Sequence, residues 1–302
     1  MKALQNAIEY FFYRVLAFVV ASLPLRAVQR FGMGLGSFIY TVLPIRKRVV
    51  FENLQRAFPE KSDAEREAIA LGSYRNLFCT LLESLWFVRL TPEMITRMVE
   101  VRNGDLLLRA LEAGKGLIVL SGHYGNWELM AIGLPIFARV PFVVIAQKQR
   151  NTYVDAYVTA MREHLGNTMV MMDQAPRVVL RTLHNGGAIA LLADQSGPQD
   201  GLFIKFFGHY TSTHKGPAIF SMRTGAPIVM TYTHRNADGT FRIECELLDM
   251  TGVSGTDEEK VRRLTELHVK ALEDHIRAYP EPWLWMHKRW KHPYKEELKA
   301  AV

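Results

Sequence analysis

From Gly116 onward the chain alternates short apolar runs with amphipathic stretches, and this alternation limits the possible fold more than any other feature. The run Gly116–Ser121 is apolar almost throughout, which is typical of a parallel strand buried on both faces. Stretches with apolar residues at helical spacing separate such runs. Strands alternating with helices of about ten to fifteen residues predict an α/β fold with a mainly parallel central sheet flanked by helices.

The expected elements can be placed along the chain from these patterns. A turn at Asn236–Gly239 predicts one antiparallel hairpin at the edge of the sheet. The predicted strands are 116–121, 142–146, 168–172, 188–193, 228–233 and 241–248, and the predicted helices are 62–88, 106–113, 126–137, 152–164, 177–185, 215–224 and 256–279.

Composition places the chain among basic globular proteins. The 302 residues are 49% hydrophobic and 22% charged, which excludes a disordered chain. Lys and Arg number 37 against 30 Asp and Glu, so the formal charge of +7 favours an anionic partner such as nucleic acid, a lipid head group or an acidic protein. The two cysteines, Cys79 and Cys245, provide neither a disulfide framework nor a cysteine-based zinc site, which favours a reducing compartment.

The N-terminal region is apolar and basic, with six basic and no acidic residues between Tyr10 and Phe51. Its apolar run, Val15–Leu25, has 11 residues, short of the roughly 20 that span a bilayer. A membrane anchor or in-plane helix, a buried core helix and a cleaved signal peptide all remain possible, and the first fits best. A second apolar stretch carries Gly32 and Gly36 at a spacing that permits close helix packing. We therefore divide the chain into a membrane-associating helical segment, 1–45, and an α/β domain, 46–302.

A motif with catalytic potential follows the strand Gly116–Ser121. The segment Ser121–Glu128 contains His123 and, five residues later, Glu128. If His123 lies in the strand-to-helix turn and Asn126 caps the helix, Glu128 can face back toward the imidazole. A carboxylate bonded to one ring nitrogen leaves the other nitrogen as a general base. A capped helix whose histidine merely satisfies a turn would show the same pattern.

The same turn offers an anion site, and other reaction classes lack their motifs. Exposed amides at the helix start could hold a developing oxyanion. The sequence has no Gly-x-Ser-x-Gly elbow, no P-loop and no His-Glu-x-x-His motif. His209 and His214 are more consistent with surface or substrate-lining positions than with a zinc site, so we expect no metal. What remains is deprotonation of a hydroxyl that attacks an activated acyl group.

The segment Ser121–Glu128 resembles the His-x4-Asp/Glu motif of glycerolipid-type acyltransferases. The chain as a whole is more similar to the late acyltransferases of lipid A biosynthesis, the lauroyl and myristoyl transferases of Gram-negative bacteria. Further motifs of that family occur in the expected order and cover most of the chain, namely Arg46–Leu54, Ala57–Pro59, Gly187–Gln195, Phe206–Gly208 and Trp283–Trp290.

The resemblance implies transfer of a fatty acyl chain from acyl carrier protein to a hydroxyl of a lipid A precursor. The reaction would take place on the cytoplasmic face of the inner membrane, without a cofactor and without nucleic acid. His123 would be the general base and Glu128 its orienting partner. Substrate-binding positions would be Asn126, Arg150, Arg162, Asp194 and Gln195, of which the arginines could equally be solvated and Asp194 could cap a turn.

One departure leaves the acceptor open. Family members often have Asp-Gln-Asp or Asp-Gln-Asn before a Gly-Pro pair, whereas this chain has Ser196 after Asp194 and Gln195. Related enzymes acylate mannosylated inositol lipids or other glycolipids, and acyl-CoA is an alternative donor. A lipid-binding protein with an inactive site and a thioesterase-like hydrolase are further alternatives.

The C-terminal block Trp283–Trp290 interleaves three tryptophans with cations. Aromatic rings beside cations suit a lipid head-group interface, or a surface for an acidic carrier protein. Plain packing of the tryptophans and, less consistently, stacking on nucleic acid would use the same residues.

Overall fold

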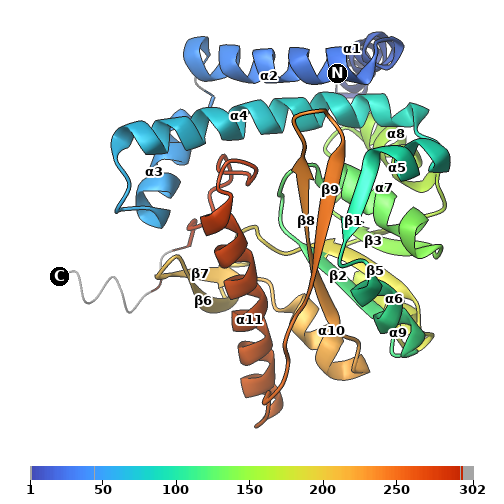
Figure 1. The fold of residues 1–302 in the computed structure, drawn as a ribbon, viewed down its shortest axis with the longest axis vertical. Helices are drawn as coiled ribbons and strands as arrows, with labels where there is room; N and C mark the ends of the chain where they lie inside the picture. The colour runs from blue at the N-terminus through green and yellow to red at the C-terminus, as the bar shows by residue number, and fades with distance from the viewer. Residues whose placement is uncertain (1, 44, 293, 295–302) are drawn as a thin grey trace.

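The predicted α/β architecture is confirmed by the computed structural model of the protein, which describes residues 2–43, 45–292 and 294 (Figure 1). A seven-stranded sheet has the order β1-β9-β8-β2-β5-β3-β4. Five of its strands, β8, β2, β5, β3 and β4, run parallel to one another, while β9 and β1 run in the opposite direction. The strands are β1 (Val99–Arg102), β2 (Leu117–Ser121), β3 (Phe142–Ala146), β4 (Thr168–Met171), β5 (Ala188–Leu192), β8 (Ile228–Arg235) and β9 (Phe241–Leu247).

The antiparallel hairpin exists, but its predicted place at the sheet edge is wrong. Strands β8 and β9 pair antiparallel across the predicted turn, and β1 then adds to the outer side of β9. A second hairpin, formed by β6 (Leu202–Phe206) and β7 (His209–Thr213), was not predicted and lies outside the main sheet. Strand β1, whose four residues alternate between partly buried and exposed, was not predicted either.

The predicted helices form within a few residues of their expected limits. Ser62 caps α4 and Thr256 caps α11, each in a capping box with the glutamate three residues later. The helices are α1 (Lys2–Ser22), α2 (Leu25–Val42), α3 (Lys47–Ala57), α4 (Asp63–Trp86), α5 (Pro92–Met98), α6 (Asp105–Glu112), α7 (Trp127–Ala138), α8 (Thr152–Glu163), α9 (Ala175–His184), α10 (Gly216–Thr224) and α11 (Asp257–Ala278).

Helices cover both faces of the sheet because its central strands are apolar on both sides. All five residues of β2 are buried. Ile118 and Leu120 pack into a core that includes residues of α9, α10 and α11. Leu117 and Val119 pack into a second core with residues of α6 and α7. The alternation along one strand thus fixes which helices lie on which face.

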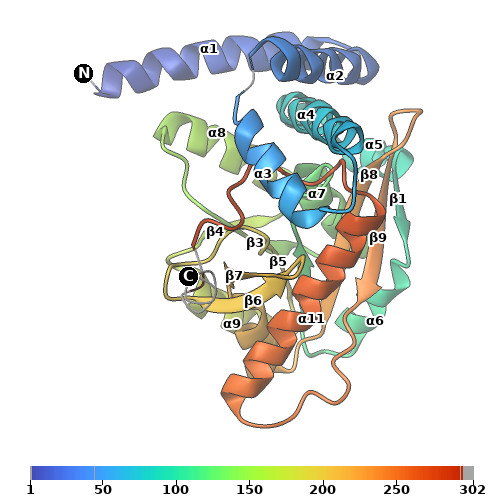
Figure 2. The same ribbon diagram turned by 90° about the vertical axis from the view of Figure 1, so that its left-hand side faces the viewer.

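Helix α4 crosses the end of the sheet where the parallel strands finish, and α1 and α2 form an outer layer upon it (Figures 1 and 2). Thr80 of α4 donates a hydrogen bond of 3.0 Å to the carbonyl of Gly125, which follows β2. Helix α1 also contacts α8, where Tyr10 of α1 stacks on Tyr153 of α8 at 5.6 Å between ring centroids. Among the described residues, no helix has the length and apolar character needed to cross a membrane.

The glycines of α2 allow it to lie directly on the backbone of α4, as their spacing predicted. A Cβ atom added at Gly36 would lie 2.6 Å from the carbonyl oxygen of Tyr74 and 2.7 Å from the Cα of Arg75. One added at Gly32 would lie 2.6 Å from the Cα of Cys79. Gly34 faces away, with no atom within 4 Å of such a Cβ.

We expect Gly36→Ala to destabilise the protein by about 1–3 kcal/mol, because the added methyl group would force α2 away from α4. Gly34→Ala is the matched control and should be neutral or stabilising by up to about 1 kcal/mol, since alanine favours a helix and meets no neighbour there. Denaturant unfolding followed by circular dichroism measures both changes. Equal stability of the two variants would contradict the close packing.

Candidate active site

Parallel register brings two candidate residues to the same edge of the sheet. Ser121 of β2 pairs with Leu192 of β5. Two residues beyond this pair, the chain places His123 after one strand and Asp194 after the other. Their side chains therefore meet at the carboxyl ends of neighbouring strands, where parallel sheets form ligand crevices.

Asp194, rather than Glu128, bonds to the imidazole of His123, so the predicted orienting contact of Glu128 is corrected. The Nδ1 of His123 lies 2.8 Å from Oδ1 of Asp194. The other carboxylate oxygen, Oδ2, accepts hydrogen bonds from the backbone N–H of His123 at 2.8 Å and from Nε1 of Trp283 at 2.9 Å. This carboxylate holds the proton on Nδ1 and leaves Nε2 as the basic nitrogen.

His123 and Asp194 each shift the pKa of the other. Burial alone would lower the pKa of His123, but the charge and hydrogen bond of Asp194 outweigh it, and Glu128 adds to them, so this pKa lies above its ordinary value. For Asp194, burial acts to raise the pKa, but the imidazole of His123 and the hydrogen bonds from His123 and Trp283 lower it to about 2. Asp194 is therefore ionised at neutral pH.

Glycines allow the tight turn that carries His123. Gly125 has a φ of +58°, and a Cβ there would lie 1.7 Å from the carbonyl oxygen of Thr233. A Cβ at Gly122 would lie 3.0 Å from Oδ2 of Asp194. As predicted, Asn126 caps the helix that follows, since its side-chain oxygen accepts from the N–H of Leu129 at 2.9 Å.

Four backbone amides around this turn are bonded within the fold. The N–H of His123 donates to Asp194, that of Tyr124 to the carbonyl of Gly122, and that of Gly125 to the carbonyl of Pro282. The N–H of Leu129 donates to the capping oxygen of Asn126. The predicted anion site at the first amides of the following helix stays a prediction.

Glu128 holds Arg162 instead of the histidine. It lies in the first turn of α7, and Arg162 approaches from the last turn of α8, with Nε 2.8 Å from Oε2 and Nη2 2.5 Å from Oε1. Both side chains are largely buried. The bidentate contact fixes the guanidinium plane beside the catalytic turn.

A cavity of about 440 Å³ lies against these groups, a size typical of ligand pockets. Its polar end combines side chains that follow β2 and β5 with others from α7 and α8. Its walls are apolar and come mainly from β3, β5 and α7. The lining residues include His123, Glu128, Arg162, Gln195, Ser196 and His214 at the polar end and Met130, Ala131, Val144, Ile145, Met172, Leu191 and Leu192 along the walls.

The other predicted substrate residues divide between the cavity and the scaffold. Gln195 lines the cavity, with its Nε2 3.4 Å from Nε2 of His123. Asn126 lies outside the lining, buried, and donates to Glu83 at 2.6 Å. Arg150 also lies outside it and pairs with Glu9 of α1 at 3.0 Å. His209 is exposed and His214 lines the cavity, which are the surface and cavity-lining positions expected for this pair.

The C-terminal block is a packing element, and the expectation of an interface through its tryptophans is wrong for two of them. Trp283 and Trp285 are buried, with ring centroids 4.6 Å apart. Arg289 is buried as well and donates to Oγ1 of Thr211 at 3.0 Å and to the carbonyl of Ser212 at 2.7 Å. The block contacts the site through the hydrogen bond from the indole of Trp283 to Asp194.

Comparison with known proteins decides the class of enzyme. The family profile described as Bacterial lipid A biosynthesis acyltransferase matches residues 1–292. The chain belongs to this family. It is thus a lipid A or glycolipid acyltransferase.

Relatives whose names give different acceptor lipids match this chain at similar sequence identity. The lipid A biosynthesis lauroyltransferase of Escherichia coli K12 is 23% identical over 90% of this chain and 88% of its own. The palmitoleoyltransferase of the same strain is 25% identical over 89% and 86%. The phosphatidylinositol mannoside acyltransferase of Mycolicibacterium smegmatis is 25% identical over 68% of this chain, and the match spans 66% of its own length.

Sequence reasoning missed the contact between Asp194 and His123 and the hydrogen bond from Trp283 to Asp194. Asp194 could have been suspected, because it directly follows the predicted strand 188–193. Nothing in the sequence places β5 beside β2, however, so the contact with His123 required the sheet order.

The contact between His123 and Asp194 predicts that the pKa of His123 changes when the carboxylate is removed. In Asp194→Asn the pKa of His123 should fall, because the anion that stabilises the imidazolium is lost. Glu128→Gln should lower the same pKa by less, since its charge contributes less than that of Asp194. Titration of ¹³C-labelled histidine by NMR resolves both variants. A larger shift in Glu128→Gln would identify Glu128 as the dominant partner of the imidazole.

Proposed function

We propose that this acyltransferase moves a fatty acyl chain from acyl carrier protein to a hydroxyl of a lipid A precursor, with His123 as general base and Asp194 as its orienting carboxylate. The observation that carries the proposal is the Nδ1 contact of 2.8 Å between these side chains at the wall of a cavity. It leaves Nε2, beside Gln195, to take a proton from a substrate.

The chemical step follows from that arrangement. Nε2 of His123 accepts the proton of the acceptor hydroxyl as its oxygen attacks the thioester carbonyl of the donor. The carbonyl becomes an oxyanion, and the amide of Gln195 is placed to donate to an oxygen next to Nε2. The C–S bond then breaks, the ester forms, and the imidazolium returns its proton to the departing thiolate. Asp194 stabilises the imidazolium between these two transfers.

Arg162 and Glu128 act on binding in this scheme. A guanidinium has five N–H donors, and two of them engage Glu128, so Arg162 has capacity for a phosphate of the acceptor or donor. Glu128 holds the guanidinium in place. The lysine at position 148 is exposed next to Gln147 and Gln149 of the cavity lining, and a cation there favours an acidic carrier protein.

The apolar walls suit an acyl chain. Met130 and Met172 lie among them, and methionines adapt to flexible apolar ligands. The acyl chain would lie along these walls with its thioester at the polar end, near His123.

His123→Ala should lower transfer of radiolabelled acyl groups from acyl carrier protein to a lipid A precursor by at least about a hundredfold, the usual contribution of a general base. His209→Ala is the matched control, since His209 is exposed on β7, and it should retain wild-type activity. Wild-type activity in His123→Ala would remove the histidine from the mechanism.

The same assay separates the competing reactions. Replacing the acceptor with a mannosylated inositol lipid tests the acceptor seen in the mycobacterial relative's name. Replacing acylated acyl carrier protein with acyl-CoA tests which of the two is the acyl donor. Release of free fatty acid without acceptor lipid would identify a hydrolase instead.

We also propose that the outer helices rest on the cytoplasmic face of the inner membrane. Phe12 and Phe18 of α1 and Phe31 of α2 have exposed fractions of 65%, 75% and 61%, which is costly in water. Basic residues Arg14 and Arg30 are exposed on the same helices, and cations favour anionic lipids. An amphipathic layer of this kind lies in the membrane surface.

Binding to vesicles that contain anionic phospholipid should weaken by more than about tenfold when Phe12 and Phe18 are both changed to aspartate, because two apolar anchors are lost. Leu247→Asp provides the control, since Leu247 is 46% exposed at the end of β9, away from this layer. Flotation on a density gradient measures the bound fraction. Equal loss in the control, or none in the double variant, would contradict docking through α1.

A further inference from the structure

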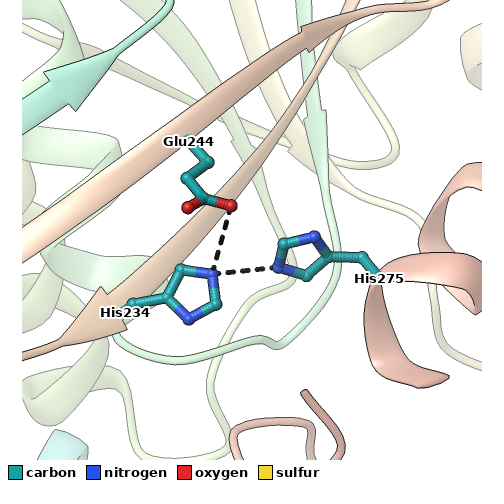
Figure 3. A group of neighbouring side chains, drawn as sticks. All are labelled: His234, Glu244 and His275. Atoms are coloured by element: carbon teal, nitrogen blue, oxygen red, sulfur yellow. Dashed lines mark hydrogen bonds and ion pairs between the residues drawn. The ribbon is translucent and has the colours of Figure 1, made fainter. Parts of the chain in front are cut away.

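Two histidines and a glutamate from β8, β9 and α11 converge (Figure 3), and none of them lines the proposed catalytic cavity. His234 comes from the end of β8, Glu244 from β9 and His275 from α11. The Nε2 atoms of the two histidines lie 3.0 Å apart, and Nε2 of His234 lies 3.7 Å from Oε2 of Glu244. All three ligand atoms lie within 4.8 Å of one another, and the group is the one cluster of its kind among the residues described.

These separations are close to those that zinc requires. Zinc binds histidine nitrogen at about 2.0–2.1 Å in a tetrahedral arrangement, so two coordinating nitrogens lie about 3.3 Å apart. Two imidazoles, one carboxylate and a water form a known zinc ligand set. Small movements of the side chains would therefore complete a coordination shell.

Neighbouring groups hold the ligands in position. Arg242 forms an ion pair with Oε1 of Glu244 at 2.8 Å, so that Oε2 is the oxygen turned toward His234. The ring of Tyr232 stacks on His275 at 3.6 Å between centroids. The ring of Tyr124 packs edge-on against both histidines, at 4.9 Å and 5.5 Å. Supporting contacts of this kind orient metal ligands.

The cluster also has access to solvent. Glu244 and His275 line a cavity of about 610 Å³ together with Asn103 and Glu246. A water on the fourth coordination position would lie on this side. Arg102 lines the same cavity, and with Arg242 it places positive charge near the ligands, so we expect weaker binding than at a four-ligand structural site.

We propose that His234, Glu244 and His275 bind a zinc ion that ties α11 to the hairpin of β8 and β9. The ion would be structural rather than catalytic, because none of its three ligands lines the cavity beside His123. Tyr124 is the residue next to His123 in the chain and packs on both histidine ligands. A bound ion would thus stiffen the support of the catalytic turn. The proposal stands independently of the acyl-transfer reaction.

The test uses untagged full-length protein stripped with a chelator and then titrated with Zn²⁺ or Co²⁺. We expect one ion per chain by calorimetry, and the visible absorption of tetrahedral Co²⁺. At a zinc concentration about one hundred times the Kd, Tm should rise by roughly 4 °C.

Three variants locate the ion. His275→Ala and Glu244→Gln should lose stoichiometric zinc binding and the Tm increase, and Glu244→Gln keeps the side-chain size, so the test survives if the alanine variant folds poorly. His184→Ala, at an exposed histidine on α9, should bind like the wild type. Absence of zinc and cobalt binding in the wild type, or unchanged binding in Glu244→Gln, would overturn the proposal.

Discussion

The hydrogen bonds to the Asp194 carboxylate are the interaction on which the site depends. One buried carboxylate accepts from the ring and the backbone of His123 and from the indole of Trp283. It therefore joins β2, β5 and the C-terminal block at one point. A buried carboxylate is stable only when such donors satisfy it, so its charge both positions the histidine and holds these three segments together. The fold and the chemistry share the same contacts.

A second buried charge connects the helix that follows the His123 turn to the helical layer formed by α4 and α2. Glu83 of α4 is fully buried and pairs with Arg235 at 2.5 Å, accepts from Asn126 at 2.6 Å and accepts from Gln29 of α2 at 2.9 Å. Removing one member of such a network leaves an uncompensated charge, which costs far more than the intact pair contributes. Through Asn126, the cap of α7, this network links the outer helices with the end of the sheet. The network thus ties α2, which carries exposed apolar residues, to the start of α7.

The two carboxylates near His123, those of Asp194 and Glu128, have different hydrogen-bond partners. Asp194 contacts the imidazole ring of His123, whereas both carboxylate oxygens of Glu128 accept hydrogen bonds from Arg162. Glu128 follows Asn126 by two residues, in the first helical turn, and that position turns it toward α8. Glu128 of the His-x4-Glu motif thus lies at a helix start, where it holds Arg162. The charge of Glu128 also raises the pKa of His123.

The sequence by itself determined most strands and helices of the main sheet and the caps of α4, α7 and α11, because these follow from local periodicity and from short-range hydrogen bonds. The parallel α/β class, the cap at Asn126 and the helix packing through Gly32 and Gly36 belong to this group. Only the tertiary structure decided that Asp194 meets His123, that Glu128 meets Arg162, and that His234, Glu244 and His275 converge. Each of these contacts joins elements far apart in the chain, and which elements become neighbours is set by sheet order and by the packing of the whole core. A single sequence carries no local signal for that order.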